Sequence, residues 1–247
     1  MGFPLMERIV YQTMAELDQR HWWYRARRHV LAALIRRLAR PPQHARVLEI
    51  GCGTGHNLAM LGEFGVVDAL ELDDEVRAVA RERLGREVMS APLPDMPGVP
   101  ERAYDLIGAF DVIEHVDDDR AALASIAARL KPGGKLVLTV PAHPWMWSAH
   151  DTVNHHKRRY SKAALKRLIE GSPLKLEAIG YFNSLLFPLA IAERLSSRLT
   201  GRDEAGLKVP PAALNRALEA AFAAERHLVG RLPLPSGLSL FAVGSAI

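Results

Sequence analysis

Three glycines and an acid crowd the point where an apolar run gives way to a predicted helix. The segment reads Glu49-Ile50-Gly51-Cys52-Gly53-Thr54-Gly55. Glycines at such a turn let the backbone bend sharply and approach a ligand closely. The dinucleotide-binding fingerprint G-x-G-x-x-G is not met, because its last position, counted from Gly51, is His56. What stands is G-x-G-x-G preceded by an acid, which predicts a ligand site at this turn.

A second acid supports a ligand with a ribose. Glu71 ends the apolar run that follows the glycine turn. A carboxylate at such a strand end can accept hydrogen bonds from both ribose hydroxyls, because each oxygen has spare lone pairs. A strand, turn and helix with an incidental acid is the alternative.

Histidines stand in the segments that should leave the ends of two later strands. His115 follows the run 104–110, His143 follows the run 135–141, and His156 lies in the next loop. Each is a candidate base, because histidine exchanges a proton near pH 7. We prefer His156, with Asp151 as the carboxylate that orients it. For each histidine the alternative is a hydrogen-bonded structural role.

Aromatic and basic residues suggest what an acceptor would contact. Trp23 and Trp145 belong to two tryptophan pairs that could exclude water and offer π faces to a cation. Arg158, Arg159 and Tyr160 close a basic loop, and paired arginines suit a carboxylate or a phosphate. These residues predict an anionic or amphiphilic acceptor. Core packing of the tryptophans and a solvated basic loop are the alternatives.

The elements that must position these residues alternate between strand and helix. Short apolar runs predict strands at 46–50, 66–72, 86–91, 104–110, 135–141, 174–182 and 237–246. Helical periodicity appears at 25–40, 56–64, 75–84, 119–130, 161–170, 185–199 and 211–228. Such alternation predicts a parallel sheet with helices on both faces, where ligands bind beyond the carboxyl ends of the strands.

The periodicity also predicts a division of the chain. We expect a helical cap at 1–44, a core at 45–182, a helical insertion or lid at 183–236 and the last strand of the core at 237–247. The helix at 185–199 mixes an apolar stripe with arginines. It is expected either to pack as a lid or to make weak contact with a membrane surface.

The chain resembles the class I S-adenosylmethionine-dependent methyltransferases, closely over about residues 45–142 and loosely over its whole length. The motifs that carry the resemblance are LEIGCGTG, ALELDDEVRAVAR, YDLIGAFDVIEHV and LKPGGKLVLTVP. The N-terminal HWW and the later HD…HxRRY segments resemble one bacterial branch of this superfamily, although His155 stands where that branch tends to have glycine.

The resemblance implies a Rossmann-like α/β fold with a seven-stranded, mostly parallel sheet, and S-adenosylmethionine as cofactor, with S-adenosylhomocysteine as product. It places Gly51 and Gly53 under the methionine part of the cofactor and includes Gly55 among the cofactor-binding residues. Glu49 is expected to orient the loop and the amino group, and Glu71 to bind the ribose. Further contacts are expected from Leu72 beside the adenine, Ser90 and Ala91 near the adenine amine, and Phe110 and Asp111 at the methionine end. The family often has Asp where Ser90 stands.

The implied function is methyl transfer to an oxygen or nitrogen of a small-molecule acceptor. A poorly acidic hydroxyl would need a base, whereas a phenol or amine needs little beyond positioning. No metal is expected, although His150, Asp151 and His156 could ligate zinc by type. The alternatives are an aminopropyl-transfer relative, whose acidic pocket is not evident, and a non-catalytic cofactor-binding or scaffold protein.

Composition excludes other classes. The 247 residues are 49% hydrophobic and 24% charged, which is typical of a globular protein and not of a disordered or fibrous one. The net charge of +4 is too diffuse, and DVIEHV too unlike a base-stacking motif, to predict nucleic acid as a partner. One cysteine excludes a disulfide scaffold. No signal peptide or membrane span is visible, so we expect a soluble, cytoplasmic protein, with the oligomeric state open.

Overall fold

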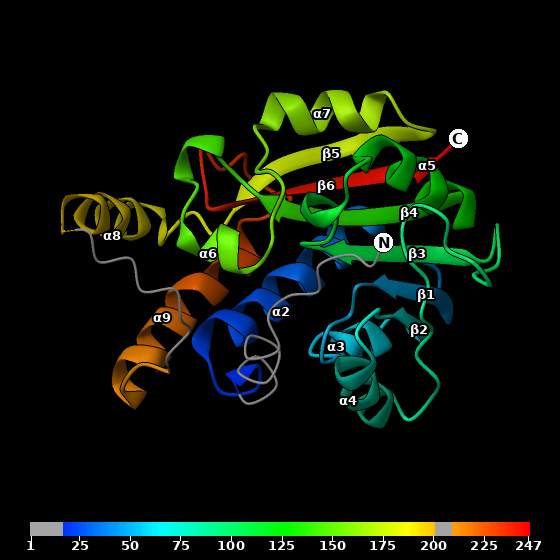
Figure 1. Ribbon diagram of the computed structural model, residues 1–247, viewed down its shortest axis with the longest axis horizontal. Coiled ribbons are helices and arrows are strands. Elements are labelled where there is room, and N and C mark those ends of the chain that lie inside the picture. The colour runs from blue at the N-terminus through cyan, green and yellow to red at the C-terminus, as the bar shows by residue number, and fades with distance from the viewer. Residues whose placement is uncertain (1–16, 201–208) are drawn as a thin grey trace.

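A six-stranded sheet forms the centre of the computed structural model, which describes residues 17–200 and 209–247 (Figure 1). In the order β2-β1-β3-β4-β6-β5, its strands are Gly65–Leu70, Ala45–Ile50, Tyr104–Phe110, Leu130–Pro141, Ser239–Ala246 and Leu174–Phe182. The first four are parallel to one another, and β6 runs antiparallel to both β4 and β5. The mostly parallel α/β fold expected from the sequence is therefore confirmed.

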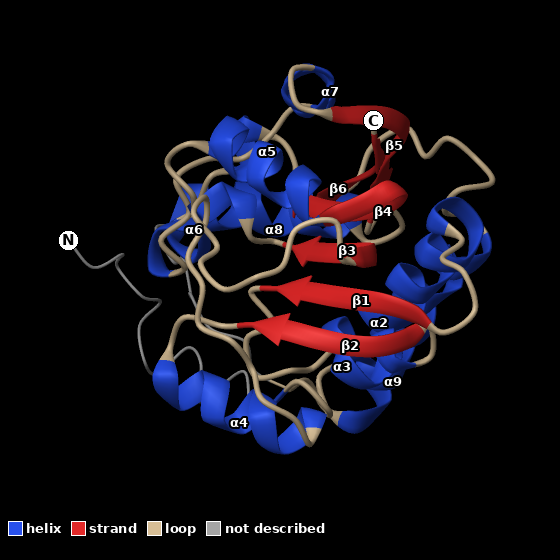
Figure 2. Ribbon diagram, turned by 90° about the vertical axis from the view of Figure 1, so that its right-hand side faces the viewer, coloured by secondary structure: helices blue, strands red, loops and turns tan. Residues whose placement is uncertain are grey.

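Alternating strand residues divide the core between the two faces of the sheet. Val47, Leu106 and Val137 pack with α2 (Trp22–Leu34), α3 (Leu58–Gly62) and α9 (Ala212–Ala224). Their neighbours Leu48, Ile107 and Leu136 pack on the other face with α5 (Asp119–Arg129) and α7 (Lys162–Glu170). Figure 2 shows the strands one above another in the order of the sheet, with helices around them. Both faces are covered, which is why these strands read as continuous apolar runs.

The strand expected at 86–91 does not form, so that expectation of a seventh strand is corrected in the described part of the chain. Met89 makes one parallel bridge to Leu70, donating to the Ala69 carbonyl (2.9 Å) and accepting from the Glu71 N–H (3.0 Å). Two prolines, Pro92 and Pro94, follow within a few residues. Proline has no N–H to donate, so the ladder cannot extend beyond the bridge.

The helix α2 packs on the sheet face beside α9 (Figures 1 and 2). The Asn215 side chain of α9 accepts from the Trp22 N–H (3.0 Å) and donates to the Arg20 carbonyl (3.0 Å). Trp22 also meets Phe222 edge to face, at 6.2 Å between ring centroids. A π-helical turn, Ile35–Ala39, continues α2 toward β1. The start of the described chain is thus fixed by an element almost two hundred residues away in the sequence.

The helix α8 (Phe187–Thr200) extends away from the body of the molecule in Figure 1. Leu189 and Leu195 on this helix are 60% and 53% exposed. It follows the carboxyl end of β5, the edge at which α6 (Ala149–Val153) also lies. Among the described residues, none of the helices combines the length and the apolar character that crossing a membrane requires. Helix α4 (Asp74–Leu84) follows β2, the strand at the parallel edge of the sheet.

Candidate cofactor and acceptor site

The glycine turn joins β1 to α3 at the carboxyl edge of the sheet. Gly51, Gly53 and Gly55 have φ angles of +64°, +56° and +82°, which side-chain-bearing residues rarely adopt. A Cβ at Gly51 would lie 2.9 Å from Val112 Cγ2, in the loop after β3. A Cβ at Gly53 would meet no atom of the described chain within 4 Å. The backbone at Gly53 is therefore open to close approach by a ligand.

Cys52 is the tightly packed residue of this turn. Its side chain is fully buried, and its N–H donates to the Leu70 carbonyl at 2.9 Å. Burial raises the pKa of the thiol, and the nearby carboxylates of Glu49 and Glu71 raise it further. The thiol is therefore held in its unreactive form.

Glu71 ties the glycine turn to the end of β2. One carboxylate oxygen accepts from the Gly53 N–H (2.8 Å), and the other accepts from the N–H groups of Leu72 (2.8 Å) and Asp73 (3.0 Å). Burial raises the pKa of this carboxyl group, and the three backbone donors offset part of that shift. Because a carboxylate has about four acceptor positions, one remains for a further donor such as a ribose hydroxyl.

Glu49 holds a buried oxygen that lacks a donor. The residue is 1% exposed, and Oε1 accepts from the Asn57 amide at 2.8 Å. Oε2 has no hydrogen-bond partner among the described residues. Burial raises the pKa of Glu49 to about 8, against the lowering effects of Asn57 and Arg27. An unpaired buried oxygen beside an open glycine backbone suits a cationic or N–H donor group of a ligand, as the amino group of S-adenosylmethionine would supply.

Asp111 leaves β3 at the same edge with a φ angle of +58°. Its carboxylate pairs with the buried Arg27 of α2 and accepts from the Thr139 hydroxyl at 3.0 Å. Arg27 also donates to Thr139 Oγ1 at 2.7 Å and lies over the Trp23 ring, 4.6 Å from its centroid. Burial alone would raise the pKa of Asp111, but Arg27 and Thr139 hold it below its ordinary value.

Arg27 is a site residue that the sequence did not single out. It is one of several arginines between residues 19 and 48, a stretch without an acid. Asp18 was missed too: it is fully buried, accepts from the Thr54 hydroxyl at 2.8 Å and pairs with Arg83. Both residues bring the N-terminal segment against the sheet edge. The many arginines of this stretch were the one signal in the sequence, and they do not indicate which carboxylate Arg27 would pair with.

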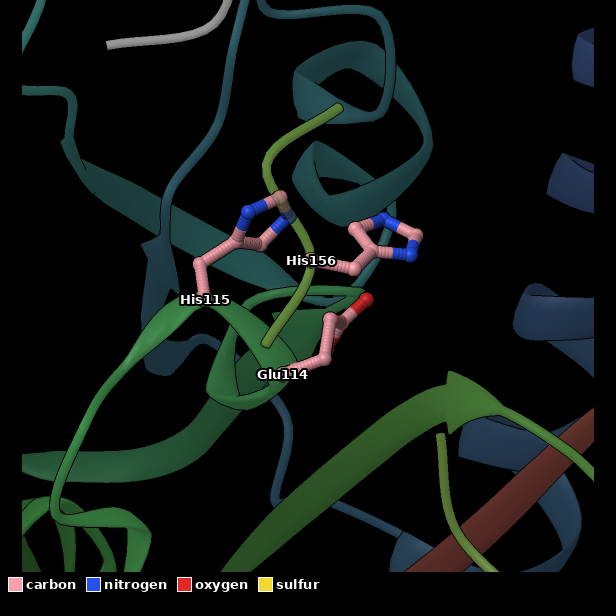
Figure 3. A group of neighbouring side chains, drawn as sticks. All are labelled: Glu114, His115 and His156. Atoms are coloured by element: carbon pink, nitrogen blue, oxygen red, sulfur yellow. The ribbon is translucent and has the colours of Figure 1, made fainter. Parts of the chain in front are cut away.

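Glu114, His115 and His156 form a group of neighbouring titratable side chains (Figure 3). Glu114 and His115 belong to the short turn Ile113–His115, and His156 follows α6. The rings of His115 and His156 meet edge to face at 4.8 Å between centroids. Burial and the neighbouring His156 lower the pKa of His115 to about 4. Burial, with the charge of Asp111, raises the pKa of Glu114 well above its ordinary value.

Asp151 orients His156, which is the contact expected from the sequence. His156 Nδ1 lies 2.9 Å from Asp151 Oδ1. The same carboxylate accepts from Arg159 Nε (2.7 Å) and from the Ser148 N–H (2.9 Å). Burial would raise the pKa of Asp151, but its bonds to His156 and Arg159 lower it below the usual range. The Asp151 carboxylate accepts at Nδ1 and so makes it the donor nitrogen; in the neutral ring the lone pair is then on Nε2.

The other candidate acceptor residues of this loop are engaged in ion pairs and hydrogen bonds. Arg158 pairs with Asp119 (2.8 Å), and Tyr160 donates to the same carboxylate (2.7 Å). Arg159 is held by Asp151 and by the Ala142 carbonyl (3.0 Å). The two guanidinium groups thus pair with separate carboxylates of the described chain, and binding of an anion by the arginine pair stays a prediction.

His143 packs among aromatic rings. It stacks on Tyr181 (5.4 Å) and Phe187 (5.1 Å), and its Nε2 lies 3.0 Å from the Ser236 hydroxyl. Within the described residues it makes no ring contact with His115 or His156. Trp145, 50% exposed, lies 5.7 Å from the His143 ring. The structure therefore joins two of the three candidate histidines and places the third at the base of α8.

The expected adenine contacts surround the end of β2. Leu72 and Ser90 are exposed there, and Ala91 is buried directly after the Met89 bridge. Phe110 is buried at the end of β3. A cavity of about 720 Å³ lies elsewhere, between α2 and α3, and reaches the turn at Gly55 and His56. Arg25 and Arg28 of α2 line that cavity, and none of the three candidate histidines does, so the candidate bases favour the strand ends as the reaction site.

Comparison with known sequences agrees with this geometry. Residues 22–179, more than half of the chain, match the family model described as a methyltransferase domain. A probable S-adenosylmethionine-dependent methyltransferase of Mycolicibacterium smegmatis is 28% identical over 70% of this chain and 67% of its own length. A protein of the same description from Mycobacterium tuberculosis is 33% identical over 53% of this chain and 46% of its own length.

Two further comparisons bear on the chemistry and the fold. An O-methyltransferase of Penicillium expansum is 33% identical over 42% of this chain and 41% of its own length. The chain thus spans less than half of two of these three relatives. A methyltransferase solved with the Haloferax volcanii Trm112 activator shares the fold, with a TM-score of 0.62, 17% identity and coverage of 96% of this chain and 97% of that chain. The chain therefore belongs to the family of S-adenosylmethionine-dependent methyltransferase domains.

Proposed function

We propose that this chain transfers the methyl group of S-adenosylmethionine to a small-molecule acceptor, at an oxygen or nitrogen atom, with oxygen favoured. The observation that carries the proposal is the Asp151–His156 pair, which lies beside Asp111 at the same sheet edge as the glycine turn. A hydroxyl acceptor needs a base there, whereas an amine does not. The Penicillium expansum relative, which is named an O-methyltransferase, supports oxygen.

The proposed cofactor contacts follow from the donors and acceptors at this edge. The free oxygen of Glu49 would accept from the cofactor amino group, and the remaining acceptor position of Glu71 would take the ribose. Leu72, Ser90 and Ala91 would border the adenine, and the glycine turn, Phe110 and Asp111 would border the methionine end. Bound there, the sulfonium supplies an activated methyl group.

The chain's own part in the transfer is to hold an acceptor and move one proton. His156 Nε2 would take the hydroxyl proton as the acceptor oxygen bonds to the methyl carbon, and the carbon–sulfur bond breaks with its electron pair going to sulfur. Asp151 would stabilise the resulting imidazolium, since it is already bonded to Nδ1. Burial around His115 and Glu114 would exclude competing water.

The acceptor itself would be met by groups other than the arginines. Arg158 and Arg159 already pair with Asp119 and Asp151, so they give no support to an anionic headgroup. Exposed apolar side chains at Trp145 and along α8 follow the carboxyl ends of β4 and β5. They support an acceptor that has an apolar part.

Calorimetric titration with S-adenosylhomocysteine tests the cofactor site. We expect wild-type binding that is lost, by about a hundredfold or more in affinity, in Glu71→Ala, because this change removes the ribose acceptor and three bonds that hold the turn. Glu82→Ala, on the exposed side of α4, is the matched control and should bind as wild type does. A folded wild type that fails to bind would reject the proposal in favour of a scaffold role.

Turnover assays test the base. With a hydroxyl acceptor identified by screening, His156→Ala should lower kcat by about a hundredfold or more while the affinity for S-adenosylhomocysteine stays unchanged. His155→Asn is the control, since Asn tolerates the positive φ angle of +53° at that position. Equal loss of turnover and cofactor affinity in His156→Ala would indicate a structural role for this residue.

A further inference from the structure

Glu114 carries an unexplained buried carboxyl group. The residue has no exposed surface, and neither of its side-chain oxygens has a hydrogen-bond partner among the described residues. A buried carboxyl group without donors is costly, so such groups are normally paired, hydrogen-bonded or bound to a metal. Asn57 supplies a donor to the comparable Glu49, but Glu114 has no such neighbour in the described chain.

Two imidazoles face the same space. Glu114, His115 and His156 each offer one ligand atom, and these atoms lie within 4.8 Å of one another (Figure 3). Zinc-type ions hold their ligands at about 2.1 Å, so modest side-chain rotations would close the three around one ion. The three residues come from two segments, the turn after β3 and the loop after α6, which the Lys157 N–H joins by donating to the Glu114 carbonyl at 2.8 Å.

The surroundings also have the form of a metal site. Asp151 accepts from His156 Nδ1, and it is fixed in turn by Arg159 and Ser148. The backbone of His155 hydrogen-bonds the His115 ring. Histidine ligands characteristically use one nitrogen for the metal and donate from the other to a carboxylate or a carbonyl. A His156 that acted only as a base would also need the Asp151 contact. That role would not account for the buried carboxyl group of Glu114, whose oxygens have no donor among the described residues.

We propose that Glu114, His115 and His156 bind one divalent transition-metal ion. Two imidazoles and one carboxylate favour Zn²⁺, Fe²⁺ or Co²⁺ over the all-oxygen coordination that Mg²⁺ and Ca²⁺ prefer. Three protein ligands leave coordination positions open, as in catalytic rather than structural metal sites. The proposed site departs from the expectation that no metal is needed. It also differs from a His150, Asp151 and His156 set, because Asp151 here orients a ligand.

The ion would activate the acceptor, and this role rests on the proposed methyl transfer. The cluster lies close enough to Asp111 for their charges to interact, so it borders the methionine end of the proposed cofactor site. With the ion bound, His156 Nε2 would be a ligand in place of the base described above, because Nδ1 is already bonded to Asp151. An acceptor hydroxyl on the ion would instead lose its proton to solvent near neutral pH. Its oxygen would then bond to the methyl carbon while the carbon–sulfur bond breaks, with the electron pair going to sulfur.

Cobalt titration tests the site. Metal-stripped protein should take up one Co²⁺ per chain, with visible d–d absorption, and one equivalent of Zn²⁺ should displace it. Glu114→Gln and His115→Ala should weaken Co²⁺ binding by about tenfold or more, as expected for the loss of one ligand. His155→Asn, which changes a neighbouring histidine outside the set, should bind Co²⁺ as wild type does. Wild-type-like binding by both ligand variants, or no uptake by wild type, would overturn the site.

Separate measurements distinguish this site from the proposed function. Binding of S-adenosylhomocysteine to Glu114→Gln, measured by calorimetry, should match wild type and shows that the variant is folded. In the ternary complex, bound Co²⁺ should relax the S-methyl protons of S-adenosylmethionine more strongly than the adenine protons. Equal relaxation of both would overturn the role at the acceptor. A protein that binds Co²⁺ but no S-adenosylhomocysteine would overturn the proposed function and leave the ion site intact.

Discussion

The buried carboxyl group of Glu49 couples stability to pH. Its pKa is about 8 in the folded chain and near the ordinary 4.5 when unfolded, so between these values the folded state binds the extra proton. The free energy of unfolding should therefore fall as pH rises through this window. The slope from one such group approaches about 1.4 kcal/mol per pH unit.

Urea denaturation at several pH values between about 5 and 8 measures this effect. Glu49→Gln keeps the shape and the Asn57 contact but cannot ionise. The difference in unfolding free energy between wild type and variant should change with pH in the stated direction, whereas Glu82→Gln on α4 should follow wild type. A difference that is constant with pH would contradict the burial of an unpaired carboxyl group at position 49.

The Arg27–Asp111 pair joins α2 to the end of β3. Removing one partner leaves a charge with poor compensation, so Arg27→Ala should destabilise the fold by about 3 kcal/mol. The double variant Arg27→Ala/Asp111→Ala should lose less than the sum of the two single changes, because they share one interaction. Additive losses in a denaturation cycle would show that the two residues act independently.

Gly53, in the turn between β1 and α3, is needed both for its positive φ angle and for the space that it leaves to a ligand. Gly53 and Gly85 both have positive φ angles and open space where a Cβ would lie. Gly53→Ala and Gly85→Ala should therefore cost a similar amount of stability, about 1–2 kcal/mol each. Only Gly53→Ala should weaken S-adenosylhomocysteine binding in calorimetry, since its methyl group enters the space that the cofactor approaches. Equal affinities would place the ligand elsewhere.

Helices and strands with a clear hydrophobic periodicity could be predicted from the sequence, whereas contacts between side chains far apart in the chain could not. The strand at 174–182 and the helix capped by Ser161 form where their patterns indicated. The apolar character of 86–91 suggested a strand, but the prolines after it limit pairing to one bridge. Helix α9 was expected in an insertion; its packing on α2 depends on Asn215, whose partners are far away in the chain.

The same limit applies to the candidate site. The glycine turn and Glu71 could be found because their spacing along one strand-turn-helix unit fixes their geometry. Glu114 could not be found, since an acid next to a histidine says nothing about its burial or its missing donors. The partner of Arg159 could not be found either, because the sequence shows its charge and not the Asp151 carboxylate that pairs with it.

Across the whole molecule, local unfolding should be rarest in the central strands and most frequent in the exposed helix α8. Residues 47–50 of β1, 106–110 of β3 and 136–140 of β4 are buried, so their amides should exchange with solvent only on global unfolding. Amides of α8 should exchange fastest among the described helices, because its leucines are exposed. Hydrogen exchange followed by mass spectrometry checks this order. Protection of α8 equal to that of β4 would show that another surface covers this helix.

The buried thiol of Cys52 can report on ligand binding, through the rate at which it reacts with an added reagent. It is the one cysteine of the 247 residues, and its thiol is enclosed in the glycine turn with a raised pKa. A thiol-specific dye can therefore react only during moments when the turn opens. Any compound that keeps the turn closed should delay labelling. Chemical libraries can thus be screened for binding on the unmodified protein, before any acceptor has been identified.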